Sequence, residues 1–307
     1  MKQIHIGEII RQRRTELGMT QEELCEGICE SPTMSRIENG KQTPSCSKLN
    51  ALLGRLGLPS EKYYAMMSEN ELEIERLKVE ILDCNTRGKS SEGLEKMGKL
   101  MALTDKDDHI THQFIARSRV LLGREEDGNI LSYSTEEKLD ILFKAIKMTI
   151  SNFDLDEIGR HWYSLEELQI INQIGIVYGD NEQRRRAIDV YYQLMKYVKR
   201  RIVANSDNAP IISLVAYNYS LYLCLEKRYE EAYETACWGW EHSVSWGRVT
   251  NLGGFMYVLA ESSYCMGKIE ESKEYYYQSY YAYKLIKDHR RGEIIKRNML
   301  EYYNEIP

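Results

Sequence analysis

Thr33 and Arg36 lie three residues apart within residues 20–45. If this segment is helical, that spacing places both side chains on one face, while Met34 and Ile37 turn to the other. Arginine can donate two hydrogen bonds to a guanine edge, and threonine can contact the methyl group of thymine. The pattern therefore indicates a recognition helix for the major groove of DNA, with Arg36 as the main base reader.

Neighbouring helices must hold that face outward. Thr20, followed three residues later by a glutamate, has the pattern of a capping box and predicts the start of a first short helix. Ser31 before Pro32 predicts the N-cap and first residue of a second helix, since this position does not need the N–H that proline lacks. Asn39-Gly40 predicts the end of that helix in a left-handed residue. We therefore expect a helix, a tight turn and a recognition helix.

The same segment resembles the helix-turn-helix of phage repressors and of bacterial regulators of the xenobiotic-response-element (XRE) type. The matching positions are Gln21, Glu22, Leu24, the run Ser35-Arg36-Ile37-Glu38-Asn39-Gly40-Lys41, and Pro44. The resemblance implies an N-terminal five-helix XRE-type DNA-binding domain over residues 1–67, with its fifth helix at 60–67. Cys25 stands where the family usually has alanine, and we expect it in the core because cysteine is small and often buried.

The resemblance also implies which side chains contact double-stranded DNA. Gln21, Asn39 and Lys41 match positions that bind phosphates and set the register without reading sequence. Pro32 lies where the family often reads bases, and Ser31 either joins it or only caps the helix. Together with the two base-facing residues, the predicted DNA-binding set is Gln21, Ser31, Pro32, Thr33, Arg36, Asn39 and Lys41.

Charge is unevenly divided along the chain, whose formal net charge is −6. Residues 1–58 carry eight Lys/Arg against seven Asp/Glu, a balance of +1, so the remaining residues carry −7. An acidic remainder repels DNA and leaves the small N-terminal region to approach it. We expect each such region to bind modestly and to rely on dimerisation and direct base contacts.

The composition favours an all-α protein. Only 5 Pro and 20 Gly interrupt 307 residues that are rich in helix formers. Apolar runs are short and broken by charge, and the N-terminus has no signal-like apolar stretch, so neither a membrane span nor secretion is expected. The 7 scattered cysteines favour reduced thiols in the cytoplasm. Cys46, in the loop after Pro44, is a redox candidate.

No catalytic motif is apparent. The chain has no phosphate-binding Walker loop, no dinucleotide fingerprint, no HExxH and no nucleophile elbow, so we expect neither an enzyme nor a cofactor. His109 and His112 could share a helix face, but no further ligands accompany them, and no metal site is expected.

Residues 68–307 have the pattern of a helical-repeat array. Three times, a small residue is followed twelve residues later by another: Gly175 and Ala187, Ser220 and Ala232, Ala260 and Ser272. Paired helices approach closely at such positions, and the pattern resembles tetratricopeptide (TPR) repeats, which form right-handed solenoids. Less regular helix pairs are expected at 70–86 with 91–103 and at 109–123 with 135–152. Ser134 predicts a helix start after the turn-rich residues 123–129, and Ser164 predicts another.

The whole chain resembles the Rgg/PlcR-type (RRNPP) peptide-sensing transcription regulators of Gram-positive bacteria. The resemblance implies a homodimer that reads paired DNA half-sites and a quorum-sensing repeat domain whose concave face binds a short linear peptide. First-helix positions counted back from the small residues give the candidate peptide-binding set Asn172, Gln173, Tyr217, Asn218, Tyr257 and Glu261. Each of these could instead cap a helix or lie in solvent. Asparagine suits the task because its amide both donates and accepts.

Other interpretations stay open at this stage. The tyrosines of residues 275–283 could form a dimer interface, although packing between solenoid helices is favoured. The repeat array could dock a folded protein partner, and an apolar concave patch would favour that alternative over a peptide. An enzyme acting on a phosphoprotein or peptide is disfavoured, because the chain shows no polar triad.

Overall fold

The computed structural model describes residues 5–59, 68–202, 205 and 207–307. These residues separate into two compact units, Met1–Val177 and Tyr178–Pro307. The domain boundary predicted after residue 67 and the fifth helix predicted at 60–67 lie outside the described residues, so both remain predictions. None of the helices within the described ranges combines the length and apolar character that a bilayer crossing requires.

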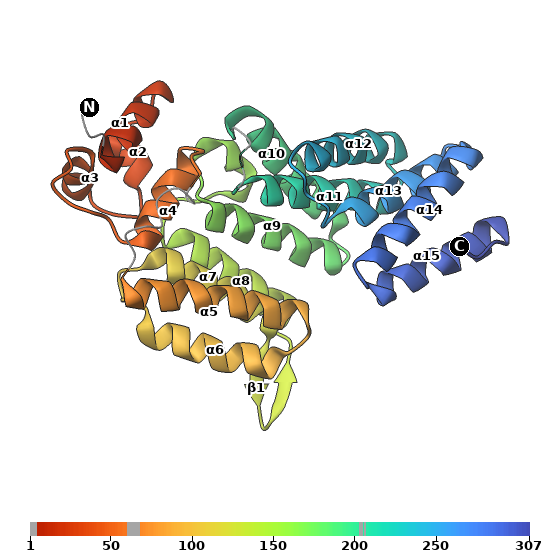
Figure 1. The fold of residues 1–307 in the computed structure, drawn as a ribbon, viewed down its shortest axis with the longest axis horizontal. Helices are drawn as coiled ribbons and strands as arrows, with labels where there is room; N and C mark the ends of the chain where they lie inside the picture. Colours follow the sequence, from red (N-terminus) through yellow and green to blue (C-terminus); the bar gives the residue numbers. More distant parts are fainter. Residues whose placement is uncertain (1–4, 60–67, 203–204, 206) are drawn as a thin grey trace. The chain divides into compact units, whose positions relative to one another are not determined.

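The N-terminal helices surround a small core of their own. They are α1 (Ile6–Glu16), α2 (Gln21–Cys25), α3 (Ser31–Glu38) and α4 (Cys46–Arg55), drawn red to orange in Figure 1. The capping box predicted at Thr20 is present, with the Glu23 N–H 3.1 Å from the threonine hydroxyl. Apolar side chains from all four helices fill the core, among them Ile10, Leu24, Cys25, Met34, Ile37, Leu52 and Leu53. The predicted burial of Cys25 is thus confirmed.

The first unit continues as antiparallel helix pairs. Its next helices are α5 (Glu69–Thr86), α6 (Ser90–Leu103), α7 (His109–Leu122) and α8 (Thr135–Lys147). These confirm the two less regular pairs, although α8 ends five residues before the predicted boundary. The glutamate three residues after Ser134 completes a capping box that starts α8. Ile74, Leu77 and Ile81 of α5 pack against Met97 and Leu100 of α6.

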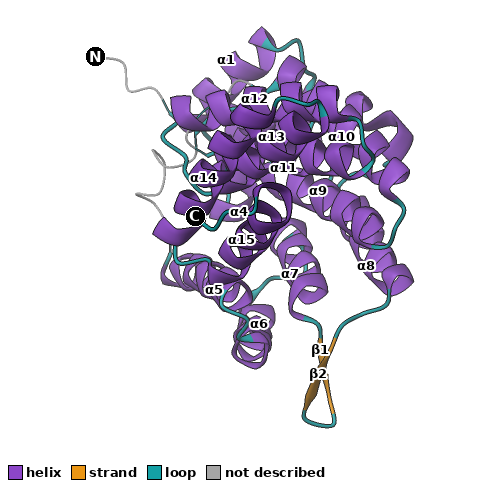
Figure 2. Ribbon diagram, turned by 90° about the vertical axis from the view of Figure 1, so that its right-hand side faces the viewer, coloured by secondary structure: helices purple, strands orange, loops and turns teal. Residues whose placement is uncertain are grey.

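One short hairpin interrupts this helical unit. Strands β1 (Arg124–Glu126) and β2 (Asn129–Leu131) pair antiparallel, and Figure 2 shows them projecting beyond the helices. The connecting residues Asp127 and Gly128 have φ values of +51° and +77°. Two positive φ values in an Asp-Gly pair are typical of the turn that matches strand twist in two-residue hairpins. The residue types predicted only a turn-rich stretch here, without paired strands.

The remaining elements continue the repeat array. They are the 3-10 segment η2 (Leu155–Arg160) and helices α9 (Leu165–Asp180), α10 (Arg184–Arg201), α11 (Ala209–Leu225), α12 (Tyr229–Ser245), α13 (Leu252–Cys265), α14 (Ile269–Leu285) and α15 (His289–Tyr303). In the second unit each helix from α10 onward packs on the next, and α11 also packs on α13. Packing of each helix on the next is the TPR-like arrangement that was predicted for the repeat array of residues 68–307.

Close helix packing occurs at the predicted small residues. Ala232, Ala260 and Ser272 are fully buried. The Ser272 hydroxyl on α14 donates to the Ala260 carbonyl on α13 at 2.6 Å, so the two helix backbones meet where the pattern predicted. On the tyrosine-rich α14, Tyr276 and Tyr283 are buried, which fits packing within the solenoid.

Candidate nucleic-acid interface and peptide-binding surface

Helix α3 has two distinct faces. Met34 and Ile37 are 0% and 1% exposed and pack in the core with α1 and α4. Arg36 and Pro32 are exposed, and Thr33 is half-buried. The predicted division between an inward apolar face and an outward polar face is therefore present. An exposed arginine on a short buttressed helix has the placement that major-groove reading requires.

The predicted role of Ser31 as N-cap is wrong. Helix α3 begins at Ser31, and Glu30 occupies the N-cap position without a side-chain hydrogen bond. The Ser31 hydroxyl lies instead 3.9 Å from the Cys25 sulfur on α2. Proline fits either of the first two helical positions, so the Ser31-Pro32 pair could not define the helix start to a single residue.

Glu38, at the end of α3, is buried and paired. Its carboxylate accepts hydrogen bonds from Arg14 Nε at 2.6 Å and Nη2 at 3.1 Å, and from Gln21 Nε2 at 2.6 Å. The interaction with Glu38 raises the pKa of the Arg14 guanidinium. The bonds tie α3 to α1 and α2, and they hold the amide of Gln21, one of the predicted phosphate contacts. Arg14 was missed in the sequence because no local spacing connects it with Glu38.

The turn after α3 presents Asn39 and Lys41 at the surface. The Asn39 side-chain amide donates to the Ser35 carbonyl at 2.7 Å. Asn39 is the C-cap residue of α3, so this bond satisfies a carbonyl in the last turn of the helix. Gly40 has a φ of +69°, and the Lys41 N–H donates to the Arg36 carbonyl at 2.8 Å. This turn leaves the Lys41 ammonium exposed beside the recognition helix, which suits a phosphate contact.

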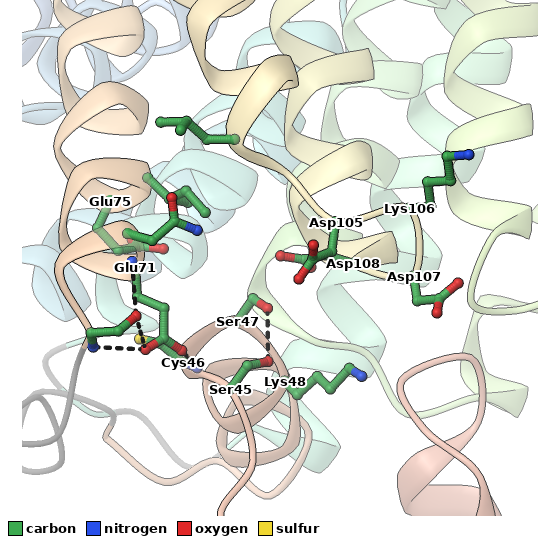
Figure 3. A pocket seen from close by; sticks show the side chains of 14 residues that line it. Ser45, Cys46, Ser47, Lys48, Glu71, Glu75, Asp105, Lys106, Asp107 and Asp108 are labelled. Atoms are coloured by element: carbon green, nitrogen blue, oxygen red, sulfur yellow. Dashed lines mark hydrogen bonds between the residues drawn. The ribbon is translucent and has the colours of Figure 1, made fainter.

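A cavity of about 560 Å³ lies where α4, α5 and the turn before α7 meet (Figure 3). Glu71 of α5 accepts the Cys46 N–H at the start of α4 at 2.6 Å, so a carboxylate satisfies that helix terminus. Five acids line the cavity against two lysines, namely Glu71, Glu75, Asp105, Asp107 and Asp108 against Lys48 and Lys106. Such a surface repels phosphate, so it does not suit a contact with DNA.

Cys46 at this cavity is a poor redox centre. Burial, together with the nearby carboxylates of Glu75 and Glu71, raises the pKa of its thiol to about 11. Because the thiolate is the reactive form, a raised pKa slows both oxidation and alkylation. The raised pKa argues against the redox role considered for Cys46 from the sequence.

The candidate peptide-binding residues differ in exposure. Asn172 on α9 and Asn218 on α11 are 2% and 7% exposed, and the Asn218 amide bonds the Tyr191 hydroxyl. Gln173, Tyr217 and Tyr257 are half-buried. The Tyr217 ring packs edge-on against a neighbouring phenylalanine of α13 at 5.9 Å. The two asparagines support the helix packing, whereas the three half-buried side chains keep surface that a ligand can reach.

Glu261 on α13 belongs to a polar cluster near the C-terminus. Its carboxylate accepts hydrogen bonds from the Tyr276 hydroxyl, from Asn298 Nδ2 at 2.7 Å and from the Tyr302 hydroxyl at 3.4 Å. Burial, followed by the Glu261 charge, raises the pKa of Tyr276 far above its ordinary value. The carboxylate therefore links α13 to α14 and α15. Within the described residues, no group of three or more His, Cys, Asp or Glu side chains could hold a metal ion.

Comparison with protein families identifies two segments of the chain. Residues 10–62 match a helix-turn-helix model, and residues 99–303 match the model described as the RNPP family C-terminal domain. A search of curated proteins found no match.

Several solved structures share the fold. PlcR of Bacillus thuringiensis, solved with the peptide PapR7 and DNA, is 20% identical, with 94% of this chain and 98% of that chain covered and a TM-score of 0.59. Apo ComR of Streptococcus vestibularis is 14% identical, with 97% and 98% covered and a TM-score of 0.53.

Aspartyl phosphate phosphatase F of Bacillus subtilis is 13% identical, with 99% of this chain and 82% of that chain covered and a TM-score of 0.53. A phosphatase thus shares the helical architecture, so the fold alone does not determine function. The RNPP model, however, spans well over half of the 307 residues and follows a helix-turn-helix. The chain is therefore a member of the RNPP family.

Proposed function

We propose that this protein is a sequence-specific DNA-binding transcription regulator whose repeat domain binds a short signalling peptide. The observation that carries the proposal is helix α3, whose exposed Arg36 and half-buried Thr33 lie opposite the buried Met34 and Ile37. Membership of the RNPP family supports the proposed peptide binding, and PlcR was solved in complex with both a peptide and DNA. A regulator of this kind acts by binding and is not an enzyme.

In this proposal the DNA-binding residues divide by role. Arg36 and Thr33 read base edges, with Pro32 and Ser31 at the start of the same helix. Lys41, Asn39 and Gln21 contact phosphates and set the register. The N-terminal region through residue 67 is the DNA-reading domain and residues 68–307 form the ligand-binding and dimerisation domain. The low charge of the N-terminal region makes a homodimer on paired half-sites the arrangement that yields useful affinity.

The peptide would lie along the first helices of the repeats. Gln173, Tyr217 and Tyr257 would contact it directly, because they keep accessible surface. Asn172, Asn218 and Glu261 would hold those helices in position. An extended peptide is favoured over a folded partner, because polar amide and hydroxyl groups suit main-chain recognition.

In the first step of the test, the purified full-length protein is incubated with a pool of random DNA duplexes, and the bound duplexes are selected and sequenced. We expect enrichment of a defined motif by the wild type and loss of that motif by Arg36→Ala. Affinity for the enriched duplex is then measured with and without a peptide extract of conditioned medium. Failure to enrich any motif would refute DNA reading, whereas a motif with an affinity indifferent to every extract would refute peptide control alone.

A further inference from the structure

A buried ion pair joins the last residue of α4 to the first turn of α9. Arg55 and Glu167 are 3% and 0% exposed, and Arg55 Nη2 lies 2.8 Å from Glu167 Oε1. The Nη1 atom of the same guanidinium donates to the carbonyl oxygens of Leu24 at 2.9 Å and Glu26 at 2.7 Å, at the end of α2. Arg55 thus caps the C-terminal carbonyl groups of α2 within the N-terminal domain, and it also binds a carboxylate of the repeat array.

Glu167 is equally anchored on its own side. It accepts the Thr149 hydroxyl at 2.6 Å and the Ser164 N–H at 2.5 Å, which confirms the predicted helix start. Gln113 of α7 donates to Thr149 at 2.7 Å and to the Ala145 carbonyl at 3.1 Å. A buried ion pair seldom gains stability over an apolar contact of the same shape, but it restricts which arrangement satisfies all its groups. The pair therefore specifies one placement of α4 against α9.

Backbone packing around the pair is close. A Cβ added to Gly27 would lie 2.0 Å from the Thr149 Cα, and one added to Gly54 would lie 3.2 Å from the Leu165 nitrogen. Ile110 and Trp162 from the repeat side pack against the core of the N-terminal helices. All these residues belong to the first compact unit. The ion pair is therefore surrounded by packing between the N-terminal helices and the start of the repeat array.

Helix α9 also carries two of the candidate peptide-binding residues. Asn172 and Gln173 follow Glu167 by five and six residues, which places them about 8 Å further along the same helix. A rigid helix that touches a ligand at one point and the DNA-reading domain at another can bias both sites. This link connects the proposed peptide surface to the recognition domain without passing through residues 60–67.

We propose that the Arg55–Glu167 pair is the coupling element through which α9 sets the placement of the DNA-reading domain. The inference rests on the proposed function, because it assigns the regulation of that same DNA site. Coupling between two sites is reciprocal. If a ligand on α9 changes DNA affinity through this pair, then DNA bound to the recognition helix must in turn stabilise α9. The reciprocal effect can be measured without knowing the peptide.

The experiment measures amide hydrogen exchange in residues 165–177 of the full chain, with and without the duplex enriched from the random pool. Glu167→Gln removes the charge while keeping the shape of the side chain. Glu166→Gln is a matched control, because its partner Arg117 at 2.6 Å lies on α7 within the repeat array. We expect DNA to slow exchange about fivefold or more in the wild type and in Glu166→Gln. In Glu167→Gln most of that protection should be lost.

Arg55→Lys provides a second test of the coupling if Glu167→Gln folds poorly. Lysine keeps the positive charge but cannot reach Glu167 and both α2 carbonyls with a planar fork, so it should also lose the protection. Unchanged DNA-induced protection in the folded Glu167→Gln or Arg55→Lys chain would overturn the inference, even if either substitution lowers thermal stability. Failure of the wild type to bind any duplex would instead refute the proposed function and remove the basis of the coupling.

Discussion

Glu38 and Arg14 form a bidentate ion pair beneath the recognition helix. The Nε and Nη2 atoms of Arg14 lie 2.6 Å and 3.1 Å from the two carboxylate oxygens, and the Glu38 side chain is 2% exposed. The acid that ends α3 thus points away from the DNA-facing surface and fixes that helix against α1. Its position explains how an acidic residue is accommodated at the end of a helix that is to approach phosphates.

Glu38→Gln should destabilise the N-terminal region. The amide retains one acceptor oxygen, but the charge that holds Arg14 is lost, at a cost of about 2 kcal/mol in the free energy of unfolding. Urea denaturation followed by circular dichroism measures the change. Glu16→Gln, which removes the exposed partner of Arg13, is the control and should leave the midpoint unchanged. Equal midpoints for both variants would contradict a structural role for Glu38.

Arg36→Ala should abolish discrimination between the enriched duplex and a random one while leaving the fold intact. The side chain is exposed and holds no core contact, and a lost bidentate base contact costs about 1–3 kcal/mol of discrimination. Competition binding by fluorescence anisotropy measures the ratio of the two affinities. Lys41→Ala is the comparison, and it should weaken binding to both duplexes alike and reduce the salt slope by about one. An unchanged ratio after Arg36→Ala would rule out base reading by α3.

Local patterns predicted much of this structure. The capping boxes at Thr20 and Ser134, the apolar side of α3 and the close approach of Ala260 and Ser272 all depend on residues a few positions apart or on one helix pair. Helix geometry alone determines such relationships, so they can be read from spacing.

Features that depend on distant residues could not be predicted. Arg55 and Glu167 are 112 residues apart, and neither shows a local spacing that indicates the other. Glu261 was identified by its place on a first helix, but its partners on α14 and α15 follow from packing. The hairpin at Asp127-Gly128 had a local signal in its turn residues that was interpreted only as a turn.

Gly27→Ala should separate the N-terminal helices from the start of the repeat array. The residue has a φ of +66°, and its new Cβ would meet the Thr149 backbone at 2.0 Å. We expect a loss of about 3 kcal/mol or more in the free energy of unfolding, because the contact has no flexible side chain that could yield. Denaturation and limited proteolysis between the two regions measure the effect.

Gly18→Ala is the matched control for that change. Gly18 has a similar φ of +69°, but nothing lies within 4 Å of the added Cβ. Only the left-handed backbone is then strained, at about 1 kcal/mol. Equal losses in the two variants would show that the contact with Thr149 does not hold the two regions together.

Cys46 should react slowly with iodoacetamide. With its thiol pKa raised to about 11 by burial and by Glu75 and Glu71, the thiolate is scarce at pH 8. Its alkylation there should be about a hundredfold slower than that of a free cysteine, and Glu75→Gln should accelerate it. A mass-spectrometric time course measures the rate, with the exposed Cys265 as internal reference. If Cys46 is labelled as fast as Cys265, its thiol is reactive after all, and Cys46 is again a candidate redox site.

Glu71 should make the junction between α4 and α5 sensitive to acid. Burial by itself would raise the pKa of this carboxyl, but the backbone N–H groups of Ser68 and Cys46 outweigh it and lower the pKa below the ordinary 4.5. A group whose pKa is lower in the folded chain stabilises the fold above its unfolded value. That contribution disappears as the pH falls through the folded value.

Glu71→Gln should therefore lower the denaturation midpoint at pH 7, and the difference from wild type should shrink progressively as the pH falls below about 4.5. Glu69→Gln, two residues earlier on α5 and exposed, should follow the wild type throughout. The measurement is a series of urea midpoints between pH 7 and pH 3. A difference for Glu71→Gln that stays constant over this range would mean that the side chain acts through shape rather than charge. The Glu71 carboxylate would then not be what holds the start of α4.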